Sequence, residues 1–143
     1  MNHRYAEDAL LKPNVSRPKY RNQKAMVYGM EFDSVHEAQR YMLLRAREQK
    51  GEIQNLRTQV PFLLIPRQTR PVPRYSKKTG KRLKDGIEVL EQACSYIADF
   101  VYEDVETGVT VVEDAKSDAT KTEAYRIKKK LMLMVHNIQI REV

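Results

Sequence analysis

Cysteine and glycine are scarce in this chain, and both shortages exclude classes of site. Cys94 is the single cysteine, which excludes a disulfide within the chain and favours a reducing compartment, so we expect a cytoplasmic protein. The three histidines are scattered, with no partner cysteines and no spacing typical of zinc ligands. The five glycines form no glycine-rich phosphate loop, which argues against an NTPase or a dinucleotide enzyme.

Long apolar runs are also missing. No stretch approaches the roughly 20 apolar residues that cross a bilayer, and the first ten residues contain no apolar signal core. We therefore expect no membrane partner. A length of 143 residues is enough for one hydrophobic core, and residues 23–143 are expected to form that single domain. Residues 1–22 mix prolines and charges without a period, so we expect a mobile basic tail there.

Acidic residues are absent from a stretch in which basic residues gather. The formal net charge is +7, and between Arg67 and Lys84 there are eight basic residues and no acid. Because Pro71, Pro73 and Gly80 lie there too, residues 66–86 are predicted to form an extended or mobile basic loop rather than a helix. This loop is either a solvated connection or an arm that contacts phosphates. The expected nucleic-acid contacts are Arg70, Arg74, Lys77, Lys78, Lys81 and Arg82, together with Lys128 in a later lysine-rich helix.

Residues 95–116 read as two apolar strands around a turn, with acidic residues inside them. Asp99 lies within the first strand, and Glu113, Asp114 and Lys116 gather at the end of the second. Burying a carboxylate in a strand costs on the order of several kcal/mol unless the group is paired or holds a metal. The pattern therefore predicts a site for a hard cation such as Mg²⁺, which prefers one or two carboxylates with water and phosphate oxygens.

The position of the turn decides which second acid faces Asp99. Side chains two apart on a strand share a face, so Asp114 and Lys116 project together and Glu113 projects to the other side. A turn centred between residues 105 and 106 places Asp99 on the face of Asp114. A centre shifted by half a residue places Asp99 with Glu113 instead, and the sequence leaves both registers open.

Two capping boxes mark the starts of helices. Ser34 with Glu37 predicts a helix that runs to about Lys50, and Thr120 with Glu123 predicts a second one. Strands are predicted within 53–65, 87–90, 95–116 and 137–143. The resulting order of helix, three strands, helix and strand is typical of an α/β domain.

Asp99, a hairpin and then Asp114-Ala115-Lys116 resemble the PD-(D/E)xK nuclease superfamily. The ordered segments FDSVHEAQRY, IADFVYE and VVEDAK, followed by a lysine-rich helix, are similar to a group of small phage-encoded proteins of that superfamily. The resemblance covers roughly residues 24–140. It implies a restriction-endonuclease-like core, with a mixed four-stranded sheet flanked by helices. The proline that usually precedes the first acid is Ala98 here.

The resemblance also implies roles for the site residues. Asp99, Asp114 and the backbone carbonyl of Ala115 would bind Mg²⁺ or Mn²⁺, and Lys116 would hold or deprotonate the attacking water. Glu37 would complete the metal site, a role compatible with its capping box.

Two further polar residues have weaker assignments. Glu113 is expected to face solvent on the opposite side of the strand, and it replaces Asp114 as a ligand if the register shifts. Gln59 resembles a glutamine found near the site in some relatives, and a half-exposed strand position explains it equally well.

The resemblance implies a metal-dependent endonuclease that hydrolyses DNA phosphodiesters in the host cytoplasm. Its expected substrate is branched or recombining phage DNA. Small resolvases of this type are usually homodimers, so a homodimer is expected. The alternative is a catalytically inactive nucleic-acid-binding or replication-accessory protein on the same fold.

Overall fold

The computed structural model describes residues 23–143, so the predicted basic tail at 1–22 lies outside the described residues. The elements follow the order β1 (Ala25–Val27), β2 (Met30–Phe32), α1 (Val35–Gln49), β3 (Ile53–Ile65), β4 (Gln68–Tyr75), β5 (Arg82–Glu91), β6 (Cys94–Asp104), β7 (Thr110–Asp114), the 3₁₀ helix η1 (Asp118–Thr120), α2 (Glu123–His136) and β8 (Arg141–Glu142). Within 23–143, no helix is long and apolar enough to cross a membrane.

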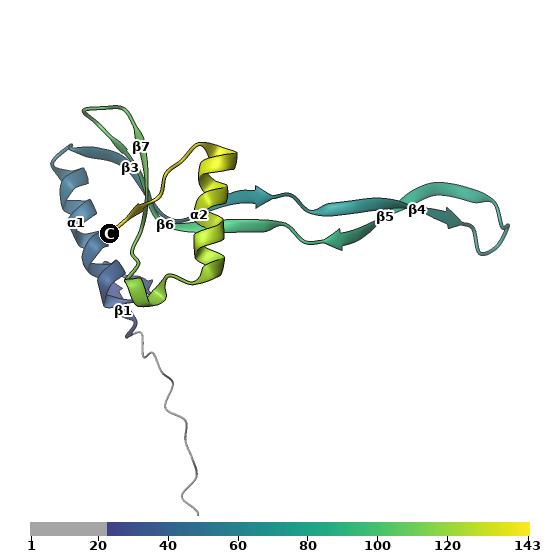
Figure 1. Ribbon diagram of the computed structural model, residues 1–143, viewed down its shortest axis with the longest axis horizontal. Coiled ribbons are helices and arrows are strands. Elements are labelled where there is room, and N and C mark those ends of the chain that lie inside the picture. The colour runs from purple at the N-terminus through teal and green to yellow at the C-terminus, as the bar shows by residue number, and fades with distance from the viewer. Residues whose placement is uncertain (1–22) are drawn as a thin grey trace, which may run out of the picture.

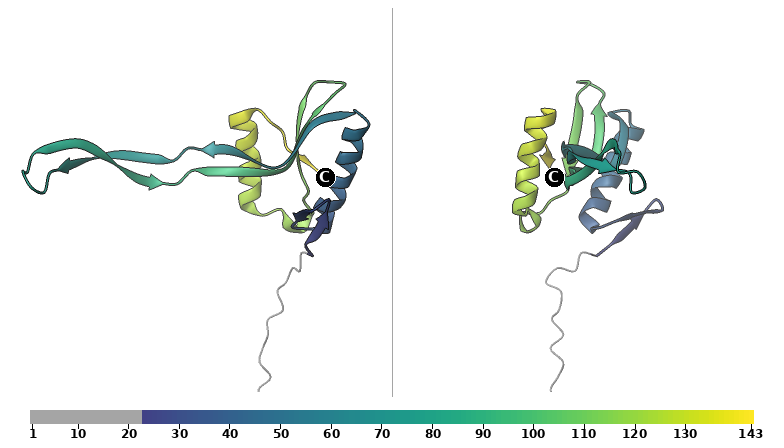
Figure 2. Two further views of the ribbon diagram at one scale, coloured as in Figure 1. Left: turned by 180° about the vertical axis from the view of Figure 1, so that it is seen from behind. Right: turned by 90° about the vertical axis from the view of Figure 1, so that its right-hand side faces the viewer.

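The central sheet has four strands in the order β3-β6-β7-β8. The first three are antiparallel neighbours, and β8 runs parallel to β7, so the sheet is mixed. Helices α1 and α2 cover its two faces (Figure 1, Figure 2). The predicted order of helix, three strands, helix and strand is confirmed for these elements, and the chain has an α/β fold.

Each face of the sheet has its own apolar core. The α1 side contains Tyr41 and Leu44 from the helix, with Phe100 and Tyr102 from β6. The α2 side contains Tyr125 and Met132 from the helix, with Tyr96, Ala98 and Val112 from the strands. Strand β6 thus supplies large side chains to both cores, which explains its long apolar run.

The cap of α1 is confirmed and that of α2 is wrong by two residues. Ser34 Oγ accepts a hydrogen bond from the Glu37 N–H at 3.1 Å, as the first capping box predicts. Helix α2 starts at Glu123, and its cap is Thr122, whose Oγ1 accepts from the Tyr125 N–H at 3.2 Å. Thr120 instead belongs to η1 and donates its hydroxyl to the Ser117 carbonyl at 2.8 Å.

The closing strand is shorter than predicted. The alternation of residues 137–143 predicts extended chain, but Asn137 ends α2 in a left-handed conformation with φ 55°, and β8 contains Arg141 and Glu142 alone. The backbone N–H of Asn137 bonds the carbonyls of Met132 and Leu133, and this cap ends the helix. The strand therefore starts later than predicted.

The basic stretch is extended rather than helical, as predicted, but it is not a loop, because residues 68–91 form a long antiparallel hairpin, called the arm below. The turn is closed by the Ser76 N–H bonded to the Lys81 carbonyl and by the Gly80 N–H bonded to the Ser76 carbonyl, each at 2.9 Å. The prolines of β4 are tolerated because an edge strand does not need every N–H. The arm extends away from the body of the molecule (Figure 1). The strand predicted at 87–90 is therefore part of β5 and pairs with β4, outside the central sheet.

Candidate functional site

Asp99 and Asp114 lie on adjacent strands at opposed positions. In the β6–β7 ladder Phe100 pairs with Glu113 and Val101 with Val112, so the same register places Asp99 opposite Asp114. Opposed residues share a face of the sheet. The face assignment of the first predicted register is therefore correct, although the turn is centred between residues 106 and 107, beyond both predicted centres.

The turn itself explains this register. The Asp104 N–H donates to the Val109 carbonyl at 3.0 Å, and Asp104 Oδ1 accepts from the Thr107 N–H at 2.9 Å. Four residues, Val105 to Gly108, thus form the loop. An aspartate whose side chain bonds the backbone of its own turn stabilises a loop of this length. The alternation of apolar residues along the strands does not reveal the loop length.

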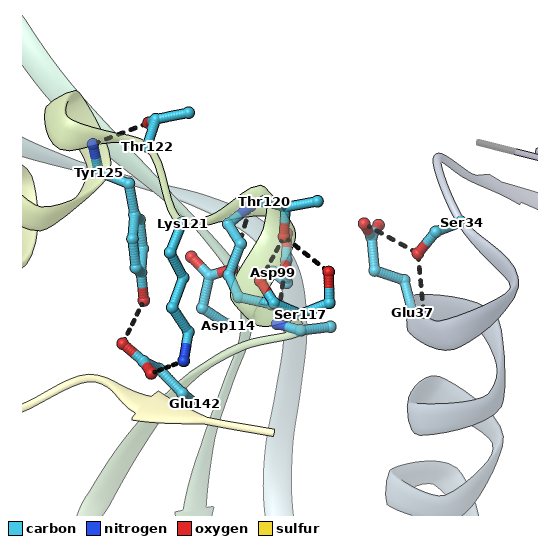
Figure 3. A network of polar contacts seen from close by, with 12 residues as sticks. Ser34, Glu37, Asp99, Asp114, Ser117, Thr120, Lys121, Thr122, Tyr125 and Glu142 are labelled. Carbon is cyan, nitrogen blue, oxygen red and sulfur yellow. Dashed lines mark hydrogen bonds and ion pairs between the residues drawn. The ribbon is translucent and has the colours of Figure 1, made fainter. Parts of the chain in front are cut away.

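Asp99 is 8% exposed and lies near Asp114 (Figure 3). Both of its carboxylate oxygens accept hydrogen bonds. Oδ2 accepts from the Ala115 N–H at 2.9 Å, and Oδ1 accepts from Gln59 Nε2 at 3.3 Å. Gln59 adopts a left-handed backbone with φ 52°, a conformation that is strained for a residue other than glycine and that often marks a functional position. The two bonds hold Asp99 in one orientation.

Burial, followed by the negative charge of Asp114, raises the pKa of Asp99 to about 7. The Ala115 N–H bond acts in the opposite direction, because it favours the carboxylate. Two acids that repel one another in a buried position are stabilised by a proton or by a cation between them.

Asp114 is 1% exposed, and its two oxygens differ in their partners. Oδ2 accepts a hydrogen bond from the Tyr96 hydroxyl at 2.6 Å. Oδ1 is buried and accepts no hydrogen bond from residues 23–143; Lys116 Nζ lies 3.3 Å away as an ion pair without hydrogen-bond geometry. Buried carboxylate oxygens are normally satisfied, so this oxygen has an unused bonding position.

Lys116 lies between two pockets at the end of β7. One, of about 390 Å³, is lined by Asp114, Lys116, Tyr125 and Lys128 among others. The other, of about 220 Å³, separates Lys116 from the start of α1 and is also lined by Glu37. Lys116 Nζ lies 5.6 Å from the centre of the Tyr125 ring, and this cation–π contact limits its orientations.

Glu37 stands apart from the two aspartates (Figure 3). Its carboxylate accepts a hydrogen bond from the Ser34 hydroxyl at 3.3 Å. Partial burial raises the pKa of Glu37, and the Ser34 bond and the Lys116 charge act against this shift. Within residues 23–143, no three histidine, cysteine or acidic side chains converge on a common point, so Glu37 does not join Asp99 and Asp114 in a ligand cluster.

Glu113 does not face solvent, so that expectation is wrong. It is 0% exposed on the α1 side of the sheet, where it accepts two hydrogen bonds from the Arg40 guanidinium at 2.7 and 2.8 Å. The Tyr102 hydroxyl donates to it at 2.6 Å, and Arg141 Nη1 lies 3.7 Å away. Both oxygens of Glu113 therefore have hydrogen-bond partners within the fold.

The donor set around Asp99 and Asp114 fits a divalent cation. Two carboxylates suit Mg²⁺ or Mn²⁺, and Asp114 Oδ1 offers a buried oxygen without a hydrogen bond. Ala115 lies beside them, and its N–H orients Asp99. The two acids and this backbone position form the candidate metal site.

The basic residues expected to contact nucleic acid lie on the arm, except Lys128. Lys128 Nζ donates to the Ser95 carbonyl at 2.9 Å at the rim of the larger pocket. Two arm residues have acidic partners, since Arg70 pairs with Glu88 and Arg82 with Asp85. The remaining four are Arg74, Lys77, Lys78 and Lys81, for which no ion pair occurs within the described part of the chain.

Sequence reasoning missed the aromatic residues of the site. Tyr96 binds Asp114, and Tyr125 positions Lys116 and donates its hydroxyl to Glu142 at 3.2 Å. Both look like ordinary core residues in the sequence. Their position on the face that carries the acids is the one signal that could have identified them, and that face is not fixed without the turn register.

Residues 17–142 match a family model described as a protein of unknown function, DUF1064, and the chain therefore belongs to this family. No curated protein and no solved structure matches the chain.

Proposed function

We propose that this member of the DUF1064 family is a PD-(D/E)xK-type nuclease, a metal-dependent endonuclease that hydrolyses DNA phosphodiesters, including those of branched or recombining DNA. One observation carries the proposal: two buried aspartates oppose each other on adjacent strands, and one of their oxygens accepts no hydrogen bond. A lysine lies 3.3 Å from that oxygen. A buried carboxylate oxygen without a hydrogen bond is costly, and such groups are typical of functional sites.

Asp99 and Asp114 would hold Mg²⁺ or Mn²⁺, with the Ala115 carbonyl as a further oxygen donor. A bound divalent ion would lower the pKa of a water and offset negative charge on the phosphate. Other residues of the protein would orient these two ligands. Gln59 and the Ala115 N–H fix the orientation of Asp99, and the Tyr96 hydroxyl fixes that of Asp114.

Lys116 would orient the attacking water and offset the charge that develops on the phosphate. Its ammonium group is held close to Asp114 and against the face of Tyr125, so it is directed to the side on which the acids lie. A fixed positive group at the reacting centre stabilises the transition state without having to reorganise.

Basic residues would hold the DNA by its phosphates. Lys128 lies with Lys116 along the pocket of about 390 Å³, where a phosphate next to the acids would be in reach. The tip of the arm carries Lys77, Lys78 and Lys81 and provides a second, more distant contact. Such contacts fix the position of the duplex and do not read its sequence.

The test is incubation of the full chain with labelled linear, flapped and four-way DNA and with RNA. Each substrate is assayed with Mg²⁺, with Mn²⁺ and with excess chelator. Cleavage of DNA that needs the metal supports the proposal, and the substrate that is cut fastest identifies the preferred structure. Absence of cleavage under all conditions, in a folded protein that binds DNA, contradicts it.

The second candidate is a nucleic-acid-binding or replication-accessory protein that has lost catalysis. Two observations favour it: Lys116 is ion-paired with Asp114, and within residues 23–143 no third acid joins the two aspartates. This candidate predicts salt-dependent DNA binding with no cleavage in Mg²⁺ or Mn²⁺.

A further inference from the structure

A basic pocket, called the α2–β8 pocket below, lies between α2 and the chain that ends in β8. Its volume is about 410 Å³, and four basic residues line it: Lys121, Arg126, Lys129 and Lys130. Among the described residues that line it, Glu142 supplies the one carboxylate, so the lining has a net charge of +3. A concave surface with this charge attracts anions.

The α2–β8 pocket is separate from the candidate metal site. Tyr125 and Met132 are the buried residues of α2 and pack against the sheet. Because an α-helix has about 3.6 residues per turn, Arg126 and Lys130 lie on one flank of this buried stripe. Lys128, which lines the pocket at the candidate metal site, lies on the other flank. A ligand in the α2–β8 pocket therefore leaves the metal site free.

Two of the four basic residues bring unpaired charges to the pocket. The side chains of Arg126 and Lys130 are exposed, and neither forms an ion pair within residues 23–143. A guanidinium group has five N–H donors and an ammonium group has three. These donors are available to a ligand.

The other two basic residues are held in place by Glu142. Its Oε2 lies 2.7 Å from Lys121 Nζ (Figure 3), and its Oε1 lies 2.5 Å from Lys129 Nζ. The Tyr125 hydroxyl also donates to Oε1, at 3.2 Å. The negative charge of Glu142 is thus offset inside the pocket, and the ammonium group of Lys129 keeps further N–H donors for a ligand.

One side of the pocket is apolar. Leu133 is 51% exposed, and Ile140 is 4% exposed beneath it in the lining. Gln139 also lines the pocket, and its amide can both donate and accept hydrogen bonds. The volume is in the range of sites for small organic molecules and exceeds what a phosphate group alone needs. These features match a ligand in which an anionic group is joined to a flat apolar body with polar edges.

We propose that the α2–β8 pocket binds a nucleotide, with its phosphate on Arg126 and Lys130 and its base against Leu133. Lys129 is a further donor to the phosphate. A guanidinium group suits this ligand because its N–H groups can bond two phosphate oxygens at once. The nucleotide is either free or part of a nucleic-acid strand, since both present the same phosphate and base. An acidic peptide fits less well, because aspartate and glutamate side chains bring no apolar surface for Leu133.

The test is isothermal titration calorimetry of the full chain with excess chelator, so that metal-dependent cleavage cannot occur. The probes are deoxyadenosine 5′-monophosphate, deoxyadenosine and inorganic phosphate, and the monophosphate should bind more tightly than either of the others. Arg126→Ala and Lys130→Ala should each weaken its binding about tenfold, because each removes charge-assisted hydrogen bonds to the phosphate. Lys50→Ala removes the same charge at the C-cap of α1, outside the pocket, and should have no effect.

A second variant tests the apolar side of the pocket. Leu133→Ser should weaken binding of the monophosphate and leave binding of inorganic phosphate unchanged, because it removes only the contact with the base. Circular dichroism checks that each variant keeps its fold. A short single-stranded oligonucleotide separates the two sources of the ligand. If it binds more tightly than the monophosphate and is weakened by the same variants, the nucleotide belongs to a strand; equal affinity assigns a free nucleotide.

Three results would overturn the proposal. The first is a monophosphate that shows no detectable binding or binds no more tightly than deoxyadenosine. The second is binding that is unchanged in both Arg126→Ala and Lys130→Ala. The third is a short polyglutamate peptide that binds more tightly than the monophosphate, which would assign the pocket to an acidic protein segment. None of these results bears on cleavage at Asp99 and Asp114, so the two proposals are tested separately.

Discussion

At the scale of single residues, adjacent acids on β7 have opposite surroundings. Both carboxylate oxygens of Glu113 are bonded within the fold, with two bonds from Arg40 and one from Tyr102. Asp114 keeps one buried oxygen without a hydrogen bond and lies near a second acid, Asp99. A satisfied buried acid stabilises the fold, whereas an unsatisfied one is costly and usually serves a site. The two residues should therefore respond differently to loss of charge.

Glu113→Gln should destabilise the protein strongly. The change removes the negative partner of Arg40 in a buried position, and breaking such a pair costs about 3 kcal/mol. The free energy of unfolding in urea measures this effect. Asp114→Asn is the matched comparison on the next residue; it loses the ion pair with Lys116 but relieves repulsion from Asp99, so it should change stability much less. Equal stability of wild type and Glu113→Gln would contradict the structural role of Glu113.

Asp99→Asn, Asp114→Asn and Lys116→Ala should each lower metal-dependent cleavage by about 100-fold or more, the usual effect of removing one electrostatic stabiliser. DNA binding should largely persist, because Lys128 and the tip of the arm would still contact phosphates. Single-turnover rates at saturating DNA measure the effect, and Glu106→Gln, an exposed acid in the same hairpin, is the control. If one of the three variants cleaves like the wild type, that residue has no place in the site.

At the scale of elements, the tip of the arm should bind phosphates without regard to sequence. Changing Lys77, Lys78 and Lys81 to glutamate should weaken affinity equally for different DNA sequences. For every phosphate that the variant no longer neutralises, the plot of log affinity against log salt concentration should flatten by about 0.9 for duplex DNA. Fluorescence anisotropy at several salt concentrations measures both quantities. An unchanged slope and affinity would show that the tip does not touch DNA.

Glu142 of β8 forms ion pairs with Lys121 and with Lys129 of α2, and this cluster should make the stability of the fold depend on pH. Hydrogen bonds from Lys121 and then Lys129 lower the pKa of Glu142 from 4.5 to about 2. Because the folded pKa lies below the unfolded one, the cluster stabilises the fold above about pH 4.5 and loses this contribution as the pH falls towards 2. Melting temperatures at pH 6 and pH 3 should differ less in Glu142→Gln than in the wild type. The difference should shrink at high salt, since the cluster is largely solvated. An identical pH dependence in both proteins would exclude this role.

Local chemistry explains which elements the sequence predicts well. Helix α1 has a serine cap and a glycine just past its end, and the structure places both ends as predicted. For the arm the sequence predicts a loop, because two prolines and a glycine suggest irregular chain. Its hairpin depends on cross-strand pairs such as Pro71 with Ile87, which a pattern read along one strand does not reveal.

At the scale of the whole molecule, the order of the helices and central strands follows from the sequence pattern, the mixed sheet is implied by the family resemblance, and the assembly of the site follows only in part. One of the two registers that the sequence leaves open places Asp99 and Asp114 on a shared face, and the structure has them there. The role of Glu113 is not predictable, because its partner Arg40 lies 73 residues away on α1. Long-range pairs of this kind depend on how α1 packs on the sheet, which is set by the whole core rather than by a local motif.

The most direct measurement for the central claim is the rate at which wild type and Asp114→Asn cut labelled duplex or branched DNA with Mn²⁺, at equal and saturating occupancy of the DNA. Our account predicts cleavage by the wild type that chelator abolishes, and a rate lower by about 100-fold or more in the variant, which keeps its fold and its DNA affinity. Equal rates in the two proteins, or no cleavage by a wild type that binds the DNA fully, would contradict it.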